Sequence, residues 1–192
     1  MNYINQEYTH TLEIKKSKFI AHIVPYSQFN ALMKRLKDQH PKARHFVYAY
    51  RYLNAFDQIV ENSSDDGEPK GTSGKPSLKV LEGAKLINTA VIIVRYFGGT
   101  RLGTGGLVRA YGDAVNAVIQ CSDLHVYKKL KTQYLHVEYT LLSKIEYMIS
   151  LLDIDIIEKQ FDIDVVLQLS ATQKEYDNLS QQLPLGLCLS DA

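Results

Sequence analysis

Apolar residues recur along the first part of the chain with two different spacings. Polar and apolar residues alternate over residues 11–15, and an apolar run follows at 19–24 after a polar turn, which predicts two strands joined in a hairpin. Apolar residues at helical spacing then predict a helix that starts with Ser27 as N-cap and stops before Pro41. Aromatic and β-branched residues predict a third strand at 45–52.

The stretch after residue 52 is polar and long, and we predict a loop there. Beyond it the pattern predicts a short helix at 77–86 and a strand at 89–97 that is apolar on both faces. A helix from about residue 105 to 121 completes this part of the chain.

The pattern restarts in the last third of the chain. The predicted elements are, in order, a strand at 135–141, a helix after the capping box of Ser143 and Glu146, paired strands at 154–161 and 163–169, a helix after the capping box of Thr172 and Glu175, and a candidate strand at 185–189. This order, βαββα with a candidate last strand, is typical of a ferredoxin-like sandwich.

Length and charge both favour two domains. A chain of 192 residues is long enough for one domain or two small ones. Residues 1–125 carry 16 Lys and Arg against 11 Asp and Glu, a net charge of +5, whereas residues 126–192 carry 6 against 10, a net charge of −4. We therefore predict an α+β protein with domains at 1–125 and 126–192, a joint within 122–132, and any polyanionic partner on the first domain.

Composition excludes several classes of protein. Apolar residues make up 45% and charged residues 22%, as in globular domains. The longest purely apolar run, about five residues at 90–94, is far short of a membrane span, which needs about 20. We expect no signal peptide in the first ten residues, and Cys121 and Cys188 form neither a disulfide framework nor a CxxC site. We expect a cytoplasmic protein without membrane association or structural zinc.

The stretch 95–109 holds five glycines between a predicted buried strand and a predicted helix. Glycines allow the backbone to approach a ligand closely, and the helix N-terminus adds unpaired N–H donors and partial positive charge. With three arginines nearby, the stretch predicts an anion site for phosphate or a nucleic-acid backbone. Thr104 stands where a Walker A loop has Lys, and Val108 stands where a dinucleotide fingerprint has its third glycine. The alternative is a tight turn in which the glycines only relieve crowding.

Three carboxylates cluster in the stretch 64–76, at Asp65, Asp66 and Glu68. The favoured interpretation is an acidic turn whose carboxylates bond backbone N–H groups and pair with arginines of the glycine-rich stretch. A divalent-cation site and a direct contact with a partner are the alternatives.

The predicted strand at 45–52 has one face with His45 and Arg51 and an opposite, aromatic face. The aromatic face predicts either core packing, which is the favoured interpretation, or a stacking platform for unpaired bases. For His45 and Arg51, structural and functional roles stay open. His45 has no Ser or Cys partner that would indicate a hydrolytic triad.

Three blocks of sequence together resemble the signature of the YigZ/IMPACT family: Ala43 to Arg51, Ser64 to Pro76, and Arg95 to Tyr111. The resemblance implies a first domain similar to domain IV of elongation factor G and to a ribosomal-protein domain, with a left-handed βαβ crossover. It implies a ferredoxin-like second domain similar to domain V of the same factor.

The resemblance also bears on function. The resemblance implies that eukaryotic relatives regulate translation by competing for a ribosome-associated activator of a starvation-sensing kinase. They carry an additional N-terminal binding domain that we do not expect in this chain, so that partner is not carried over. No enzymatic activity is attached to the bacterial members. Phe46 and Val47 depart from the pattern, where a polar residue and a Cys are expected, which counts against thiol chemistry.

We therefore expect a non-enzymatic protein that binds RNA or the ribosome and modulates translation, with no cofactor, no metal, and a translation factor as a further candidate partner. An enzyme acting on a phosphorylated small molecule and a protein–protein adaptor are the alternatives. The predicted phosphate-binding residues are Arg95, Gly98, Gly99, Arg101, Gly103, Gly105, Gly106, Arg109, His45 and Arg51. The predicted rim of the cleft consists of Asp65, Asp66, Glu68, Lys70 and Lys75.

Overall fold

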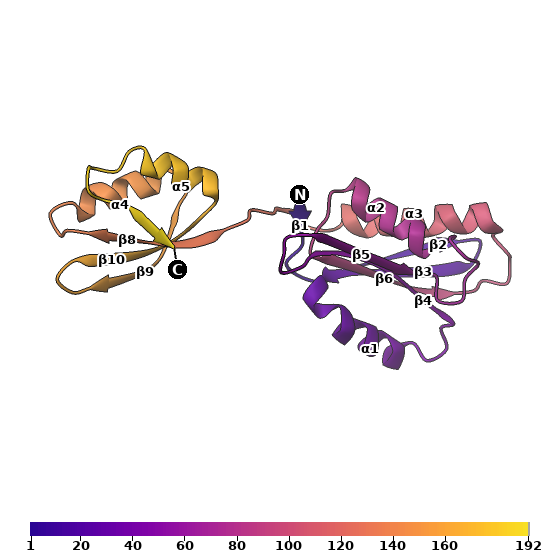
Figure 1. The fold of residues 1–192 in the computed structure, drawn as a ribbon. Coiled ribbons are helices and arrows are strands. Elements are labelled where there is room, and N and C mark those ends of the chain that lie inside the picture. The colour runs from indigo at the N-terminus through magenta and orange to yellow at the C-terminus, as the bar shows by residue number, and fades with distance from the viewer. Residues whose placement is uncertain (192) are drawn as a thin grey trace. The chain divides into compact units, whose positions relative to one another are not determined.

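The computed structural model describes residues 1–191, and the chain divides into two compact units (Figure 1). The first unit runs from Met1 to Tyr127 and the second begins at Lys128. Each unit mixes helices with an antiparallel sheet and buries its own apolar core. The expected α+β fold with two domains is confirmed.

Seven strands and three α-helices make up the first unit. In chain order they are β1 (Asn2–Tyr3), β2 (Tyr8–Ile14), β3 (Ser17–Pro25), a 3₁₀ turn (Tyr26–Gln28), α1 (Phe29–Gln39), β4 (His45–Leu53), β5 (Ile59–Ser64), α2 (Gly74–Gly83), β6 (Thr89–Tyr96), α3 (Thr104–Gln120) and β7 (His125–Val126). Five of the strands form one antiparallel sheet in the order β2-β3-β6-β4-β5, and β1 pairs with β7. The predicted hairpin is β2–β3.

Helices cover both faces of this sheet (Figure 1). On one face α1 packs through Leu32 and Leu36 against side chains such as Ile92. On the other face α2 and α3 pack, α3 through Tyr111, against side chains such as Ile93. Because β6 has a strand on each side and helices on each face, it is buried along all but its last residue, as its apolar sequence predicts.

Two crossover connections of opposite hand build the sheet. Strands β3 and β4 are both antiparallel to β6, so they run parallel to each other and α1 connects them. Strands β5 and β6 are both antiparallel to β4, and α2 connects them. The second connection crosses the sheet in the opposite direction to the first, and its strands also point the opposite way. These two reversals cancel, so by themselves they would give both crossovers the same hand. The helix of the second connection, however, packs on the opposite face of the sheet. One crossover is therefore left-handed, a rare arrangement that the resemblance implies.

Three local predictions in the first unit are wrong. Strand β5 lies within the predicted loop, and only its first two residues are large and apolar, since an edge strand held by pairing with β4 needs no continuous apolar face. Helix α2 begins at Gly74, three residues before the predicted start, where it is capped by a side chain from outside the helix. A 3₁₀ turn precedes α1, and Ser27 does not cap it.

The second unit is a ferredoxin-like sandwich, as predicted. Its elements are β8 (Lys131–Val137), α4 (Leu142–Leu151), β9 (Asp155–Phe161), β10 (Val165–Ala171), α5 (Gln173–Ser180) and β11 (Leu189–Asp191), with sheet order β11-β8-β10-β9. The capping box of Thr172 and Glu175 starts α5 as predicted. That of Ser143 and Glu146 does not form, because a turn after Glu138 brings the chain into α4 already at Leu142.

No helix within residues 1–191 is long and apolar enough to cross a lipid bilayer.

Candidate functional site

Several of the residues singled out in the sequence lie at the end of the first unit's sheet where β4 begins and β6 ends. Strand register places His45 directly opposite Arg95 across the β4–β6 pair. In an antiparallel pair, residues that precede one strand lie beside residues that follow the other. Lys42 and Arg44, just before β4, therefore lie near Phe97, just after β6.

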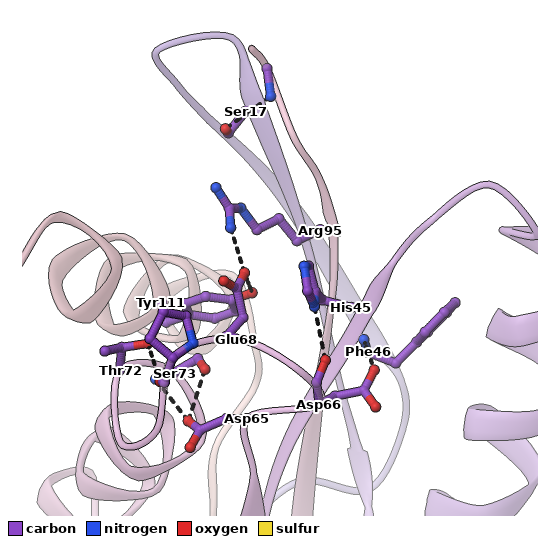
Figure 2. A network of polar contacts seen from close by, with 12 residues as sticks. Ser17, His45, Phe46, Asp65, Asp66, Glu68, Thr72, Ser73, Arg95 and Tyr111 are labelled. Carbon is purple, nitrogen blue, oxygen red and sulfur yellow. Dashed lines mark hydrogen bonds and ion pairs between the residues drawn. The ribbon is translucent and has the colours of Figure 1, made fainter. Parts of the chain in front are cut away.

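A buried ion pair forms the floor of this region (Figure 2). Arg95 donates through Nη1 to Glu68 Oε1 at 2.5 Å, and the same oxygen accepts a hydrogen bond from the Tyr111 hydroxyl at 2.8 Å. The Arg95 and Glu68 side chains are only 7% and 4% exposed. Burial, together with the negative charge of Glu68, raises the pKa of Tyr111 far above its ordinary value. Tyr111 therefore stays neutral and serves as a donor.

The Arg95 guanidinium is also enclosed by aromatic rings. Its central carbon lies 5.4 Å from the ring centroid of Phe19 and 5.8 Å from that of Phe97, within the range of cation–π attraction. Its Nε is buried and has no hydrogen-bond partner within the described residues. Arg95 is thus held in place by Glu68 and the rings, with part of its donor capacity unused.

Only one of the three clustered carboxylates pairs with an arginine, so the predicted pairing of all three is wrong. Asp65 accepts hydrogen bonds from the backbone N–H groups of Gly71, Ser73 and Gly74 and from the Ser73 hydroxyl, and so caps α2. Asp66 accepts a 2.6 Å bond from the backbone N–H of Phe46. Each Asp satisfies backbone donors that tight loops leave unpaired, as the favoured interpretation of this stretch predicts.

The ionisation of Asp65 follows from these bonds. Burial by itself would raise the pKa of this carboxyl, but the donors of Gly71, Gly74 and Ser73 stabilise the charged form and lower the pKa below its ordinary value of 3.8. Among residues 1–191, no group of three His, Cys, Asp or Glu side chains is arranged to hold a metal ion.

The glycines between β6 and α3 serve different purposes. A Cβ at Gly98 would lie 2.0 Å from the carbonyl carbon of Lys16, so only glycine allows this close approach to the β2–β3 turn. Gly99 and Gly103 have φ values of +86° and +72°, which favour glycine, while Gly105 and Gly106 lie inside α3. Crowding and turn geometry therefore account for Gly98, Gly99 and Gly103.

Helix α3 begins without a side-chain cap. Its N-cap is Gly103, and no acidic residue occupies its first turn. The first N–H groups of a helix have no partner within the helix, and they carry partial positive charge. The N-terminus of this 17-residue helix therefore presents donors beside the exposed side chain of Arg101.

Two cavities adjoin at Arg95 and Phe97, which line both. The larger, of about 350 Å³, is bounded by Glu68, Pro69, Arg95, Phe97, Arg101, Leu102, Gly103, Thr104 and Leu107. The smaller, of about 250 Å³, is bounded by Lys42, Arg44, His45, Arg95, Tyr96 and Phe97. Glu68 is the only acidic residue in either lining, and its charge is matched by Arg95.

The remaining predicted residues differ in how they relate to the two cavities. Arg109 lines a separate cavity of about 250 Å³, which shares Leu102 with the larger one. His45 bonds through Nδ1 to the carbonyl oxygen of Asp66. Lys70 and Lys75 are exposed but line neither of the two cavities, and Glu68 lies at the floor of the site instead of its rim.

Arg51 is not part of the group. It is buried at the opposite end of β4, where it pairs with Glu61 at 2.6 Å and donates to the carbonyl oxygen of Leu86. These bonds tie β4 to β5 and to the chain before β6, which is a structural role. The aromatic face of β4 also packs within the protein, with Tyr52 stacked on Tyr26 at 4.1 Å between ring centroids.

Four residues of the site were missed in the sequence: Lys42, Arg44, Phe97 and Tyr111. Three of them, Lys42, Arg44 and Phe97, are close in sequence to the predicted residues His45 and Arg95. That closeness indicates a shared site only once β4 and β6 are known to pair. Tyr111 lies two turns into α3 and reaches Glu68 from the opposite layer. No sequence spacing indicates that hydrogen bond.

Comparison with known proteins matches both units to family models. Residues 15–119 match the Impact N-terminal domain, and residues 135–184 match a domain of unknown function, DUF1949. An IMPACT family member of Haemophilus influenzae is 34% identical over 89% of this chain and 84% of its own length. The IMPACT family member YigZ of Escherichia coli is 36% identical over 89% of this chain and 85% of its own.

A solved structure supports the same grouping. The crystal structure of a hypothetical protein aligns over 100% of this chain and 96% of its own, with 32% sequence identity and a TM-score of 0.66.

Proposed function

The chain belongs to the IMPACT family, and from this premise we propose that it is a non-enzymatic protein that binds RNA or the ribosome and modulates translation. The translational part of the proposal rests on the family, whose homologues suggest a translation-related role. The RNA-binding part comes from the site where β4 begins and β6 ends.

One observation carries the RNA-binding part: unpaired cations gather around the two adjoining cavities. Lys42, Arg44 and Arg101 are exposed, and none of them forms an ion pair with another described residue. The uncapped N-terminus of α3 adds backbone donors to the same region. Free cations and N–H donors together are suited to bind phosphate oxygens.

The charge of the whole unit supports the same partner. Residues 1–125 carry a net charge of +5, which attracts a polyanion over a distance of about one Debye length, roughly 8 to 10 Å at physiological salt. A phosphate backbone brings many charges to such a surface, so the affinity for RNA should depend strongly on the salt concentration.

The salt dependence of RNA affinity tests the proposal. Affinity for a short RNA, measured at several salt concentrations, should fall steeply with salt in the wild type. Arg101→Ala and Arg109→Ala should each weaken binding to a similar extent for different RNA sequences. Each should also reduce the log–log salt slope by about 1 for every phosphate group that the variant no longer neutralises.

Lys85→Ala is the matched control, because Lys85 is exposed and its backbone lies at the opposite end of the unit, next to Leu86 and the buried Arg51. It should leave the slope unchanged. If neither arginine variant changes the affinity, or if wild-type binding at about 0.1 M salt cannot be detected, the proposal is wrong. A salt-insensitive affinity for a protein would then favour an adaptor function.

A further inference from the structure

Phe97 is an exposed aromatic residue at the centre of a basic site. The residue is 56% exposed, although it immediately follows the buried strand β6. A large apolar side chain that lies in solvent between charged groups gains little free energy from folding. The exposed part of its ring is therefore available to a ligand.

The backbone holds Phe97 in a defined place. Arg95 is fixed two residues before it by Glu68. Gly98, the next residue, packs directly against Lys16 and Ser17 and donates its N–H to the Ser17 hydroxyl at 3.1 Å. The ring is thus anchored on both sides in sequence, so a ligand that contacts it meets a preorganised surface.

The surroundings of the ring combine aromatic and cationic groups. The Arg95 guanidinium lies against the ring from within the protein, and more than half of the residue's surface remains exposed. The cavity with Lys42, Arg44 and His45 adjoins the ring, and so does the cavity with Arg101 and the start of α3. An aromatic platform flanked by two phosphate-binding regions is the arrangement by which proteins bind unpaired nucleotides.

We propose that this site takes single-stranded RNA, with one base stacked on Phe97 and the phosphates on either side of that base bound in the two cavities. The inference rests on the proposed function and narrows it to a class of RNA. In a duplex the bases are stacked on one another and unavailable to a side chain, so a duplex would engage the cations but not the ring. Simple polyphosphate would also engage only the cations.

Three probes separate these ligands: a 13-nucleotide single-stranded RNA with a central 2-aminopurine, the stable duplex of the same length, and inorganic polyphosphate. The wild type should bind the single strand most tightly and quench the fluorescent base through stacking. Phe97→Leu should weaken single-strand binding about 5- to 150-fold, the effect measured for one stacked base, and remove the quenching. Its affinity for polyphosphate should not change.

Two further variants make the result specific. Phe56→Leu is the control, because Phe56 is 81% exposed in the β4–β5 turn, beyond the opposite end of β4. It should not change the binding of any probe. Phe97→Trp should retain both the affinity and the quenching, since a larger ring still stacks. Melting curves should show that all three variants are folded, because both phenylalanines are exposed.

The outcomes distinguish this inference from the proposed function. If Arg101→Ala weakens binding of all three probes but Phe97→Leu changes none, the stacking inference is wrong and the RNA-binding proposal stands. Equal affinity for duplex and single strand would also overturn the inference. If no probe binds, the RNA-binding proposal itself is wrong. If Phe97→Leu weakens binding to ribosomes but to no RNA probe, the ring contacts a protein, which overturns the inference.

Discussion

Arg95 and Glu68 form the most buried ion pair among residues 1–191, and their energetics follow from that burial. Removing two charges from water is costly, and the attraction between them, with the hydrogen bond from Tyr111, offsets that cost. Such a pair adds little net stability, but breaking it leaves a single charge in the interior. The pair therefore specifies the geometry at the floor of both cavities.

Loss of either partner should destabilise the protein, and loss of both should cost less than the two single losses added together. We expect Arg95→Met to lower the free energy of unfolding by about 3 to 5 kcal/mol, because it leaves the Glu68 carboxylate buried and unpaired. Glu68→Gln should also destabilise the protein. The double variant should be less destabilised than the sum of the two, as expected for residues in direct contact. Urea denaturation at neutral pH measures all three.

Arg109→Ala is the control for these stability measurements, since Arg109 is exposed and, among residues 1–191, its side chain bonds only a carbonyl oxygen of its own helix. We expect its free energy of unfolding to stay within about 0.5 kcal/mol of the wild type. Strict additivity of the Arg95 and Glu68 variants would mean that the two charges do not interact.

At the scale of elements, Asp65 couples a loop to the start of α2. The carboxylate is positioned just after β5 and accepts bonds from Ser73 and Gly74, so the end of an edge strand caps a helix nine residues away. Gly74 allows the close approach, because a Cβ there would lie 2.7 Å from the Ser64 backbone. The hydrogen bonds of Asp65 therefore link the end of β5 to the start of α2.

Because Asp65 caps α2 in its charged form, the free energy of unfolding should depend on pH. Because the folded-state pKa of Asp65 is lowered, its contribution to stability is present above about pH 4, near its ordinary pKa, and is lost as the pH falls through the folded value. Asp65→Asn should lower the free energy of unfolding by about 1 to 3 kcal/mol at pH 7. The variant should also lose less stability than the wild type below pH 4.

Urea denaturation between pH 2 and pH 7 measures this difference. Asp113→Asn is the control, since Asp113 is exposed on α3 and has no hydrogen bond or ion pair in the described structure. It should follow the wild-type curve. If the free energy of unfolding falls equally with pH in Asp65→Asn and the wild type, the Asp65 cap does not contribute to the loss of stability in acid.

At the scale of the whole molecule, two units with opposite charge and separate cores share one chain. Strand β7 belongs to the first unit, since Asn2 and Tyr3 of β1 pair with Val126 and His125. The backbone N–H of Tyr127 also bonds the carbonyl oxygen of Met1. A division after residue 125, as the charge pattern indicates, would cut this pairing.

We predict that residues 1–127 fold on their own, because both cores of the first unit lie within this range. Limited proteolysis should cut within 122–132 and leave stable fragments, and the isolated 1–127 fragment should unfold in one cooperative transition. A fragment of residues 1–121, which lacks β7, should be less stable. If the 1–127 fragment does not fold, or if no cut falls near the joint, the domain division is wrong.

The sequence alone determined the elements whose pattern reflects local physics. The β2–β3 hairpin, the doubly apolar strand β6, the capping box of α5 and the ferredoxin-like order of the second unit all follow from alternation, helical spacing and caps. Family resemblance added the left-handed crossover, which no local pattern contains. Strand β5 escaped prediction because its stability comes from pairing with β4 and not from its own residues.

Only the tertiary structure decided what the charged residues do. In the sequence both Arg51 and Arg95 are candidates for binding phosphate, yet Arg51 ties β4 to its neighbours and Arg95 pairs with Glu68. Phe97 became a candidate binding residue only once strand pairing placed Lys42 and Arg44 beside it. The physical reason is that ion pairing, burial and exposure depend on residues far apart in the chain, and these meet only in the folded protein.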